Sequence, residues 1–468
     1  MKEVKTGVLK NGFRFYSFFD PNVHLCGVGV KAGLIHDPED ARGMAHGVEH
    51  HVCRETESHN AREIELIFRE LDCGPHGSIK IQTTDTSTFF GTDMLMYRKH
   101  MQKLFPVFAS IVKEPLMTEA GWKSEKGAIF VEYLHGGKDS LEDEVSIYLH
   151  QLVYERNPIR NRLDCELDDL KRLGVERVRA FKKAHYVANN MFALIFGPKF
   201  SEARRMAEEH FGNLPMVEIP KLNYDFSDSR PVLTGVKHHS VHRPGFNVHH
   251  VGMGFPLSPI TPDDGEDVAL EVLKEVLEYR IEEVLRGKNR AWDKGTYHPR
   301  VRINRSFVHG LFCVWWPTPS MESVEMGEGL VIRECERIKG NGFIEAEIER
   351  AVESVAESNR VERRRRLVRR YKAELNEEVK RLRQGILNHH RSQYSMMLGG
   401  LAEMVIEAAT NGDEELKGLN SYSRRLIGVT RSKVVEIANK YLTTDAYARV
   451  VIHPMELPQS ELAPVVTP

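Results

Sequence analysis

Two histidines and a glutamate in the run HGVEH, residues 46–50, stand at a spacing that can hold one metal ion. An α-helix turns once in about 3.6 residues, so positions i, i+3 and i+4 share a face, and His46, Glu49 and His50 would converge on one point. A catalytic zinc ion keeps an open position for water, and a neighbouring carboxylate can take the proton of that water. We expect His46 and His50 to bind the metal and Glu49 to act as the base.

The alternative is a chance match, because a chain with 22 histidines would contain such a pattern in about one case in ten by composition alone. A third ligand would decide between the two. The segment Thr118–Gly137 predicts a helix with Thr118 as its cap and a glycine pair at its end. Glu125 and Glu132 lie two turns apart on one face of that helix. We predict Glu132 as the third ligand and Glu125 as an outer carboxylate that orients a ligand or the water.

Over nearly its whole length the chain resembles the pitrilysin and insulinase family of zinc metallopeptidases, which carry the inverted zincin motif. The motif stands here as GMAHGVEH, and Glu125 and Glu132 match the spacing of the family's downstream glutamates. The opening VKTGVLKNGFRFYSF resembles the family's first hairpin, and FKKAHYVANNMFALIFGP, residues 181–198, resembles a later helix and strand. The resemblance implies one zinc ion per chain and an endopeptidase that cleaves oligopeptides or small unfolded polypeptides.

The same resemblance implies substrate-binding residues in both halves of the chain. A strand of the first half carries an N-A-x-T pattern in the family, and the matching run here is KIQT, so Lys80 replaces the Asn and Thr83 is kept. The second half of family members supplies an Arg and a Tyr toward the scissile carbonyl. The run LRGKNRAWDKGTY leaves Arg286 and Arg290 as alternatives for the Arg, and it gives Tyr297 as a donor to the oxyanion.

The composition is that of an ordinary globular enzyme, with 41% hydrophobic and 28% charged residues. A formal net charge of −2 gives no overall attraction to nucleic acid or to an anionic membrane. The basic segment 360–384 also carries glutamates, which favours a solvated helix over one that binds nucleic acid. No stretch approaches the roughly 20 apolar residues of a membrane span. Because no signal or presequence pattern is visible, we expect a cytoplasmic protein.

An internal repeat relates the two halves of the chain. NVHLCGVGV begins at Asn22 and NVHHVGMGF at Asn247, an offset of 225 residues. At the same offset HGVEH falls on EVLKE, residues 271–275, which contains no histidine. The second copy has therefore kept the pattern of the fold and lost the metal ligands.

Strands that cluster before helices, without regular alternation, predict an α+β fold of two homologous domains. Each domain is expected to hold an antiparallel sheet with helices packed on one face. We predict a catalytic domain at 1–217, a linker rich in Pro, Asp and Ser at 218–235, and an inactive domain at 236–468.

The family resemblance implies that the two domains close as a clamshell around the peptide substrate. It also implies pairing with another chain, as a homodimer or as a heterodimer with an inactive homologue. Two alternatives follow from the same family. The chain could be the catalytic subunit of a heterodimeric processing peptidase, or a structural subunit that has lost hydrolysis.

Overall fold

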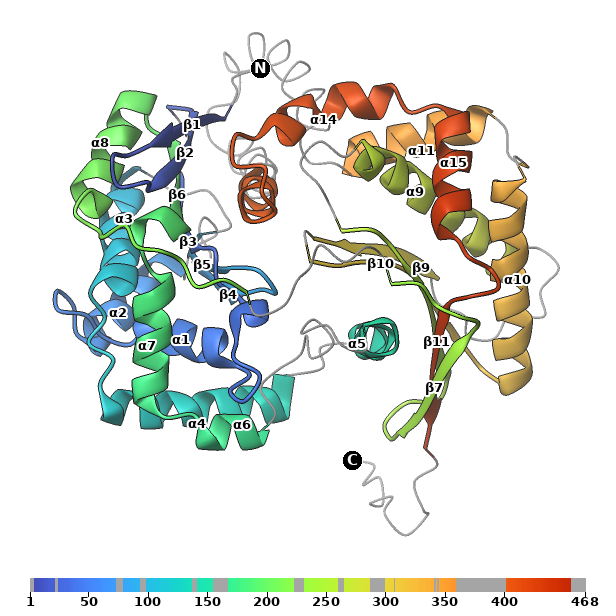
Figure 1. The fold of residues 1–468 in the computed structure, drawn as a ribbon, viewed down its shortest axis with the longest axis horizontal. Helices are drawn as coiled ribbons and strands as arrows, with labels where there is room; N and C mark the ends of the chain where they lie inside the picture. Colours follow the sequence, from blue (N-terminus) through green and yellow to red (C-terminus); the bar gives the residue numbers. More distant parts are fainter. Residues whose placement is uncertain are drawn as a thin grey trace, which may run out of the picture. The chain divides into compact units, whose positions relative to one another are not determined.

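The computed structural model describes residues 4–455 except for 22–23, 73–78, 93–97, 137–140, 155–166, 223–230, 260–264, 287–298, 307, 341, 343–344 and 359–400. The chain forms two compact units, whose elements are drawn in Figure 1. Unit 1 comprises Met1–Gly137, Leu163–Tyr224 and Ala356–Ser423, and unit 2 comprises Lys138–Arg162, Asp225–Val355 and Arg424–Pro468.

Unit 1 is built on a six-stranded sheet in the order β1-β2-β6-β3-β5-β4. Its strands are β1 (Lys5–Val8), β2 (Arg14–Phe19), β3 (Leu25–Val30), β4 (Ile79–Thr83), β5 (Thr88–Thr92) and β6 (Met191–Gly197). The pair β2/β6 is parallel, and the other neighbouring pairs are antiparallel. The central strand β6, MFALIFG, is buried at every residue, as its apolar sequence requires.

Helices cover one face of this sheet and enclose its main core. The helices of unit 1 are α1 (Met44–Val52), α2 (Ala61–Asp72), α3 (Arg98–Lys113), α4 (Glu119–Gly136), α6 (Leu167–Arg172), α7 (Val175–His185) and α8 (Phe200–Phe211), with short 3-10 turns at Leu34–His36 and Ala188–Asn190. Buried side chains of α1, α3 and α8, such as Val48, Phe105 and Phe211, pack with Phe15 and Val28 of the strands. The predicted helix Thr118–Gly137 is confirmed as α4.

Unit 2 repeats the arrangement with a five-stranded sheet in the order β7-β11-β8-β10-β9. Its strands are β7 (Lys237–Arg243), β8 (His249–Pro256), β9 (Arg300–Arg305), β10 (Gly310–Thr318) and β11 (Ala448–Pro454). Its helices are α5 (Leu141–Val153), α9 (Glu266–Arg286), α10 (Met321–Lys339) and α15 (Arg431–Tyr441), while α11 (Glu345–Ser358) and α14 (Lys417–Ile427) each extend across a boundary between units.

The five strands of the second sheet follow the same order as five strands of the first, with β1 as the additional edge strand of unit 1, which supports the repeat seen in the sequence. The parallel pair β7/β11 corresponds to β2/β6, and β8 corresponds to β3 at the offset of 225 residues. The prediction of two homologous α+β domains is confirmed. Each sheet is mixed and not purely antiparallel, because the last strand of each copy inserts beside its first long strand in the same direction.

The units do not coincide with consecutive halves of the sequence, because each unit takes a helix from the other half. Residues 138–162, which we predicted within the first domain, belong to unit 2, and residues 356–423, predicted within the second, belong to unit 1. Helix α5 packs on β8 and β11. The helical segment 401–410 packs on the sheet of unit 1, where Leu401 and Val405 join a core with Tyr16 and Phe192. Each sheet is thus covered on its second face.

The recurring glycine pair of the repeat makes room for this second layer. A Cβ added to Gly252 would lie 2.1 Å from Cγ1 of Val145 in α5, and one added to Gly29 would lie 2.2 Å from the Phe192 ring. Phe192 in turn belongs to the core that includes segment 401–410. Side chains at these glycines would therefore push the covering layer off each sheet.

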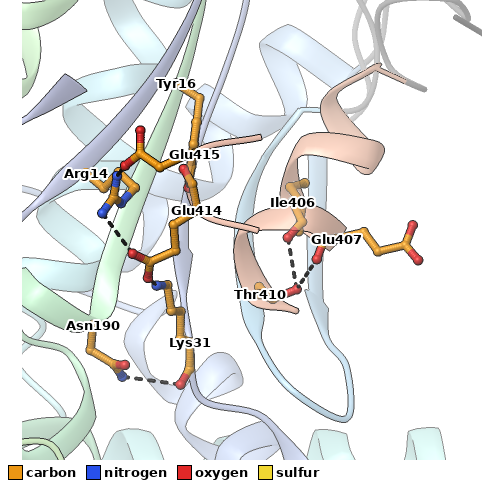
Figure 2. A network of polar contacts seen from close by, with 9 residues as sticks. All are labelled: Arg14, Tyr16, Lys31, Asn190, Ile406, Glu407, Thr410, Glu414 and Glu415. Carbon is orange, nitrogen blue, oxygen red and sulfur yellow. Dashed lines mark hydrogen bonds and ion pairs between the residues drawn. The ribbon is translucent and has the colours of Figure 1, made fainter. Parts of the chain in front are cut away.

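A group of charged side chains fastens the chain that follows segment 401–410 to the sheet of unit 1 (Figure 2). The Arg14 guanidinium contacts Glu414 at 2.8 Å and Glu415 at 2.7 Å, and the Lys31 ammonium pairs with Glu414. The Tyr16 hydroxyl donates to the carbonyl of Glu414 at 3.2 Å. Glu414 neutralises the partly buried Lys31 and shares the neutralisation of Arg14 with Glu415, so the contact orders the segment.

No helix among the described residues is long and apolar enough to cross a lipid bilayer.

We expect unit 1 to lose stability in mild acid because of two neutral histidines, the partly buried His36 and the buried His185, whose ring centroids lie 5.4 Å apart. Burial lowers the pKa of each to about 4, with a further contribution to His36 from His185. The unfolded chain, with ordinary histidine pKa values near 6.5, binds more protons below that pH. The free energy of unfolding should therefore fall as the pH drops from about 6.5 to 4, by about 1 to 3 kcal/mol per histidine.

The measurement is denaturant unfolding of the full chain between pH 7.5 and 4.5, compared with His185→Gln. The variant should show a shallower dependence of the unfolding free energy on pH. Equal slopes for wild type and variant would contradict the assignment.

Candidate metal centre and active site

Helix α1 carries HGVEH and is held at its first turn by a buried carboxylate. Asp37 accepts hydrogen bonds from the backbone N–H groups of Gly43 at 2.7 Å, Met44 at 3.2 Å and Ala45 at 2.8 Å. Gly43 precedes the helix with a φ of 82°, a left-handed conformation that suits glycine. Burial raises the pKa of Asp37 to about 7, and the three amide donors oppose that shift. The cap satisfies amides that a nine-residue helix cannot satisfy internally.

The other side of α1 is packed against α4. The ring of His51 is hydrogen-bonded through Nε2 to the carbonyl of Thr118 at 3.0 Å and lies 5.6 Å from the Trp122 ring. Gly47 allows this approach, because a Cβ there would lie 2.9 Å from Trp122. His51 is thus buried between the helices, and it fixes α1 relative to α4 without facing the metal-binding side.

Three donor atoms from α1 and α4 converge. His46 Nε2 and His50 Nε2 lie 3.1 Å apart, and Glu132 Oε2 lies 3.1 Å from His50 Nε2 and 3.8 Å from His46 Nε2. A tetrahedral ion with bonds of about 2.0–2.1 Å separates its ligand atoms by about 3.3 Å. The observed separations lie on either side of that value. Two imidazoles and one carboxylate also form a ligand set that zinc accepts in catalytic sites, so the residues fit the metal.

The centre is partly open to solvent, as a site that admits substrate must be. The side chains of His46 and His50 are 23% and 21% exposed, and that of Glu132 is 55% exposed. Burial lowers the pKa of His46, against the charges of Glu49 and Glu132. Burial also acts to lower the pKa of His50, but the hydrogen bond to Glu125 and the nearby carboxylates outweigh it, so that pKa is raised.

Glu125 stands behind His50, where we predicted an outer carboxylate. Its Oε2 lies 3.5 Å from His50 Nδ1, the ring nitrogen that does not face His46. Its Oε1 accepts from Arg54 Nη1 at 2.9 Å. The hydrogen bond with His50 is the main reason why the pKa of Glu125 is lowered. An ionised carboxylate at Nδ1 fixes the orientation of the ring and directs the Nε2 lone pair toward the shared point.

Glu49 lies on the same side of α1 as the two histidines. Its carboxylate is among the groups with ligand atoms within 4.8 Å of one another, together with His46 and His50. The side chain is buried, and its Oε2 accepts a hydrogen bond from Thr83 Oγ1 at 2.5 Å. Glu132 Oε2 lies 3.1 Å from His50 Nε2 and 3.8 Å from His46 Nε2, which favours Glu132 as the third ligand and Glu49 as the group that handles a proton.

Sequence models of known families match most of the chain. The model described as "Insulinase (Peptidase family M16)" matches residues 20–166, and the one described as "Peptidase M16 inactive domain" matches residues 172–355. The chain belongs to peptidase family M16. The second model, which describes an inactive domain, includes EVLKE, the segment of the second repeat that lacks the histidines of HGVEH.

Curated relatives include subunits of mitochondrial assemblies. The chain is 24% identical to the beta subunit of the mitochondrial-processing peptidase of Bos taurus over 213 residues, which are 45% of this chain and 42% of that protein. It is 23% identical to cytochrome b-c1 complex subunit 1 of Rattus norvegicus over 219 residues, 46% of this chain and 44% of the relative. The chain thus matches less than half the length of these proteins.

Solved bacterial structures share the fold over almost the entire chain. A protease from Helicobacter pylori superimposes with a TM-score of 0.77 at 16% identity, covering 97% of this chain and 100% of that one. An M16-like peptidase from Alicyclobacillus acidocaldarius gives a TM-score of 0.74 at 16% identity, covering 97% and 98%.

The structure places some of the residues that the family resemblance assigned to substrate binding, and others lie outside its described part. Thr83 lies at the end of β4 and contacts Glu49, while Lys80 on the same strand pairs with Glu403 of segment 401–410 at 3.1 Å. Arg286 is the last residue of α9. Arg290 and Tyr297 lie outside the described residues.

Two residues of the centre were missed by the sequence analysis. Asp37 caps α1 from a position six residues before the helix cap, outside the usual capping spacing, so only the structure reveals it. Arg54 holds Glu125 from the residue after the C-cap of α1. A cation directly after HGVEHHVC was a visible signal, because Glu125 had already been placed beside this helix.

We predict that Asp37→Ala weakens both the fold of unit 1 and its affinity for zinc, because three amides at the start of α1 lose their acceptor. Loss of such a cap costs about 0.5–2 kcal/mol. Unfolding in denaturant and zinc competition with a chromogenic chelator would measure the two effects. Asp40→Ala serves as a matched control, since that side chain is 75% exposed and pairs only with Arg177 among the described residues. Equal zinc affinity in both variants would contradict the role of Asp37.

Proposed function

We propose that the chain is a zinc-dependent endopeptidase that hydrolyses oligopeptides or small unfolded polypeptides, with one catalytic ion held by His46, His50 and Glu132. The observation that carries the proposal is the convergence of these donor atoms, 3.1 to 3.8 Å apart, beside the carboxylate of Glu49. Chance placement of the motif would not bring a carboxylate from a second helix to the same point. Family membership supports the class of reaction.

The bound ion would supply Lewis acidity, which polarises the peptide carbonyl and makes a water molecule easier to deprotonate. Glu49 then accepts the proton of that water on its carboxylate and passes it to the leaving amine. Thr83 keeps the Glu49 carboxylate in place through the 2.5 Å hydrogen bond. Glu125 and Arg54 hold the His50 ring, so that the ligand geometry does not have to form during the reaction.

The surface beside this centre fits an extended peptide. Among the described strands, β4 is an edge of its sheet and is hydrogen-bonded to β5 only, so its other side can pair with a substrate backbone. A pocket of about 430 Å³ adjoins the strand, and its lining includes Ile64, Phe68, Ile79 and Ile81. Lys80 would not block pairing, because its side chain is engaged with Glu403 and the backbone carries the interaction. We infer that an apolar substrate side chain enters this pocket.

The relatives support two alternatives to a chain that is catalytic by itself. The similarity to the mitochondrial-processing peptidase beta subunit supports a catalytic subunit of a heterodimer, and the similarity to cytochrome b-c1 subunit 1 supports a structural role. The intact ligand set favours catalysis over a purely structural role. The chain would act alone, as a homodimer, or as a heterodimer with an inactive homologue. The closing of the two domains around the substrate, the role of Tyr297 and a cytoplasmic location stay predictions.

The deciding experiment is zinc content and peptide cleavage of the purified chain and of Glu49→Gln. We expect the variant to keep zinc and to lose turnover by about 10²- to 10⁴-fold, because Glu49 moves a proton and does not hold the ion. Glu57→Gln, a change at an exposed glutamate after the same helix, should leave both unchanged. A folded, metal-free Glu49→Gln protein would show that base and ligand are exchanged. Zinc without cleavage in the wild type would indicate a missing partner.

The two glutamates of α4 should differ in their effect on zinc affinity. Glu132→Ala removes a ligand atom 3.1 Å from His50 Nε2, whereas Glu125→Ala removes only the support of the ring. We predict a collapse of zinc binding for Glu132→Ala and a loss of about 10- to 100-fold for Glu125→Ala, measured by chelator competition. Normal binding by Glu132→Ala would show that another residue is the third ligand.

A further inference from the structure

Three histidines of unit 2 stand in one row across three neighbouring strands, far in sequence from HGVEH. His242 of β7 is the register partner of His453 in β11. In the antiparallel pair β11/β8, Ile452 lies opposite His250. One residue further along the same register, His453 comes opposite His249. Residues opposite one another on neighbouring strands point to the same face of a sheet, so the three rings share one face.

The rings are in contact. His249 Nδ1 and His453 Nδ1 lie 3.0 Å apart, and the rings of His242 and His453 stack with their centroids 4.8 Å apart. His249 and His453 are half-buried, while His242 is exposed on the edge strand β7. An exposed ring can turn about its side-chain bonds at little cost, so a nitrogen of His242 can approach the other two.

The pair in unit 2 has nearly the geometry of the pair in the metal centre of unit 1. The closest nitrogens are 3.0 Å apart here and 3.1 Å apart between His46 and His50. The ring planes cross at 82° here and at 80° there. The ligand nitrogens of a tetrahedral zinc ion are separated by a similar distance. Two imidazoles at this distance, with their rings nearly perpendicular, can both direct a nitrogen lone pair toward one ion.

The row ends at a polar atom without a partner. Thr318 of β10 is the register partner of His249, and its hydroxyl oxygen is buried with no hydrogen-bond partner among the described residues. Buried hydroxyls are almost always paired, so this hydroxyl remains able to hydrogen-bond to a water molecule at the end of the row. The nearby cation Arg449 does not oppose an ion fully, because Glu328 neutralises it at 2.6 Å.

We propose that His249 and His453 are ligands of a second divalent transition-metal site, with His242 as the third and water in the remaining position. Imidazole nitrogens without carboxylates select zinc, copper or nickel over magnesium and calcium. The alternative without a metal is a hydrogen bond between the neutral rings of His249 and His453. The neutral form of imidazole is the one that binds metal.

An ion at this place would join the edge strand β7 to β11 and β8. Strand β7 follows the segment that leaves unit 1, and the edge of a sheet is its least secured strand. The site is thus structural in unit 2, while the ion of unit 1 is catalytic, and the two inferences are independent.

The test is zinc content of the full chain after dialysis against zinc, with the wild type and three variants. The wild type should hold about two ions per chain, and His249→Ala/His453→Ala about one, with peptide cleavage retained. His46→Ala/His50→Ala should also hold about one ion, without cleavage. His238→Ala, at an exposed position of the same strand β7, should match the wild type. If the proposed function failed instead, the wild type would hold about one ion and the His249→Ala/His453→Ala protein none.

A second measurement avoids variants that fold poorly. Diethyl pyrocarbonate modifies free imidazoles, and peptide mapping reports the modification of each histidine in the unaltered chain. Zinc should protect His249 and His453 and leave His238 reactive. Equal zinc content in the wild type and in His249→Ala/His453→Ala, or equal modification of His249 and His453 with and without zinc, would overturn the proposal.

Discussion

The candidate metal centre depends on one short helix that is fixed in place at both ends. A helix of nine residues is marginal by itself in water, so its position must come from tertiary contacts. Asp37 satisfies the first amides, and on the far side His51 binds the Thr118 carbonyl while Arg54 reaches Glu125. These contacts fix α1 relative to α4, and only then can imidazoles from one helix and a carboxylate from the other meet within 4 Å. A substitution at one of these supporting residues would alter the positions of the candidate ligands without removing any of them.

The sequence predicted those parts of the site that depend on spacing within single helices. His46, Glu49 and His50 share a face for that reason, and so do Glu125 and Glu132. The family resemblance was needed to bring the two helices together. Contacts between segments that lie far apart in the chain could not be predicted from the sequence. The substrate contact predicted for Thr83 stays a prediction, whereas its hydrogen bond to Glu49 was not predicted, because nothing in its own strand indicates that partner.

The architecture shows the same division between local and long-range information. The repeat and the α+β class followed from patterns along the chain, and both sheets confirm them. The exchange of helices between halves did not, because the apolar stripe of a covering helix fits either sheet in principle. The recurring glycines indicate where each covering layer packs. Bulky side chains cross the strands at Gly27 and Gly29 in one copy, and at Gly252 and Gly254 in the other. A glycine pair in a buried strand is a sign of close approach by another layer.

The exchange also sets an order in time for a nascent chain. The strands of the first sheet are complete at Gly197, but the segment that covers Tyr16 and Phe192 ends at about residue 410. At synthesis rates of about 5–20 residues per second, that apolar face would wait roughly 10 to 40 s for its cover. During that interval it presents aromatic surface to any other chain nearby. We therefore expect the yield of the protein to respond to cellular factors that shield exposed apolar surface more strongly than its final stability does.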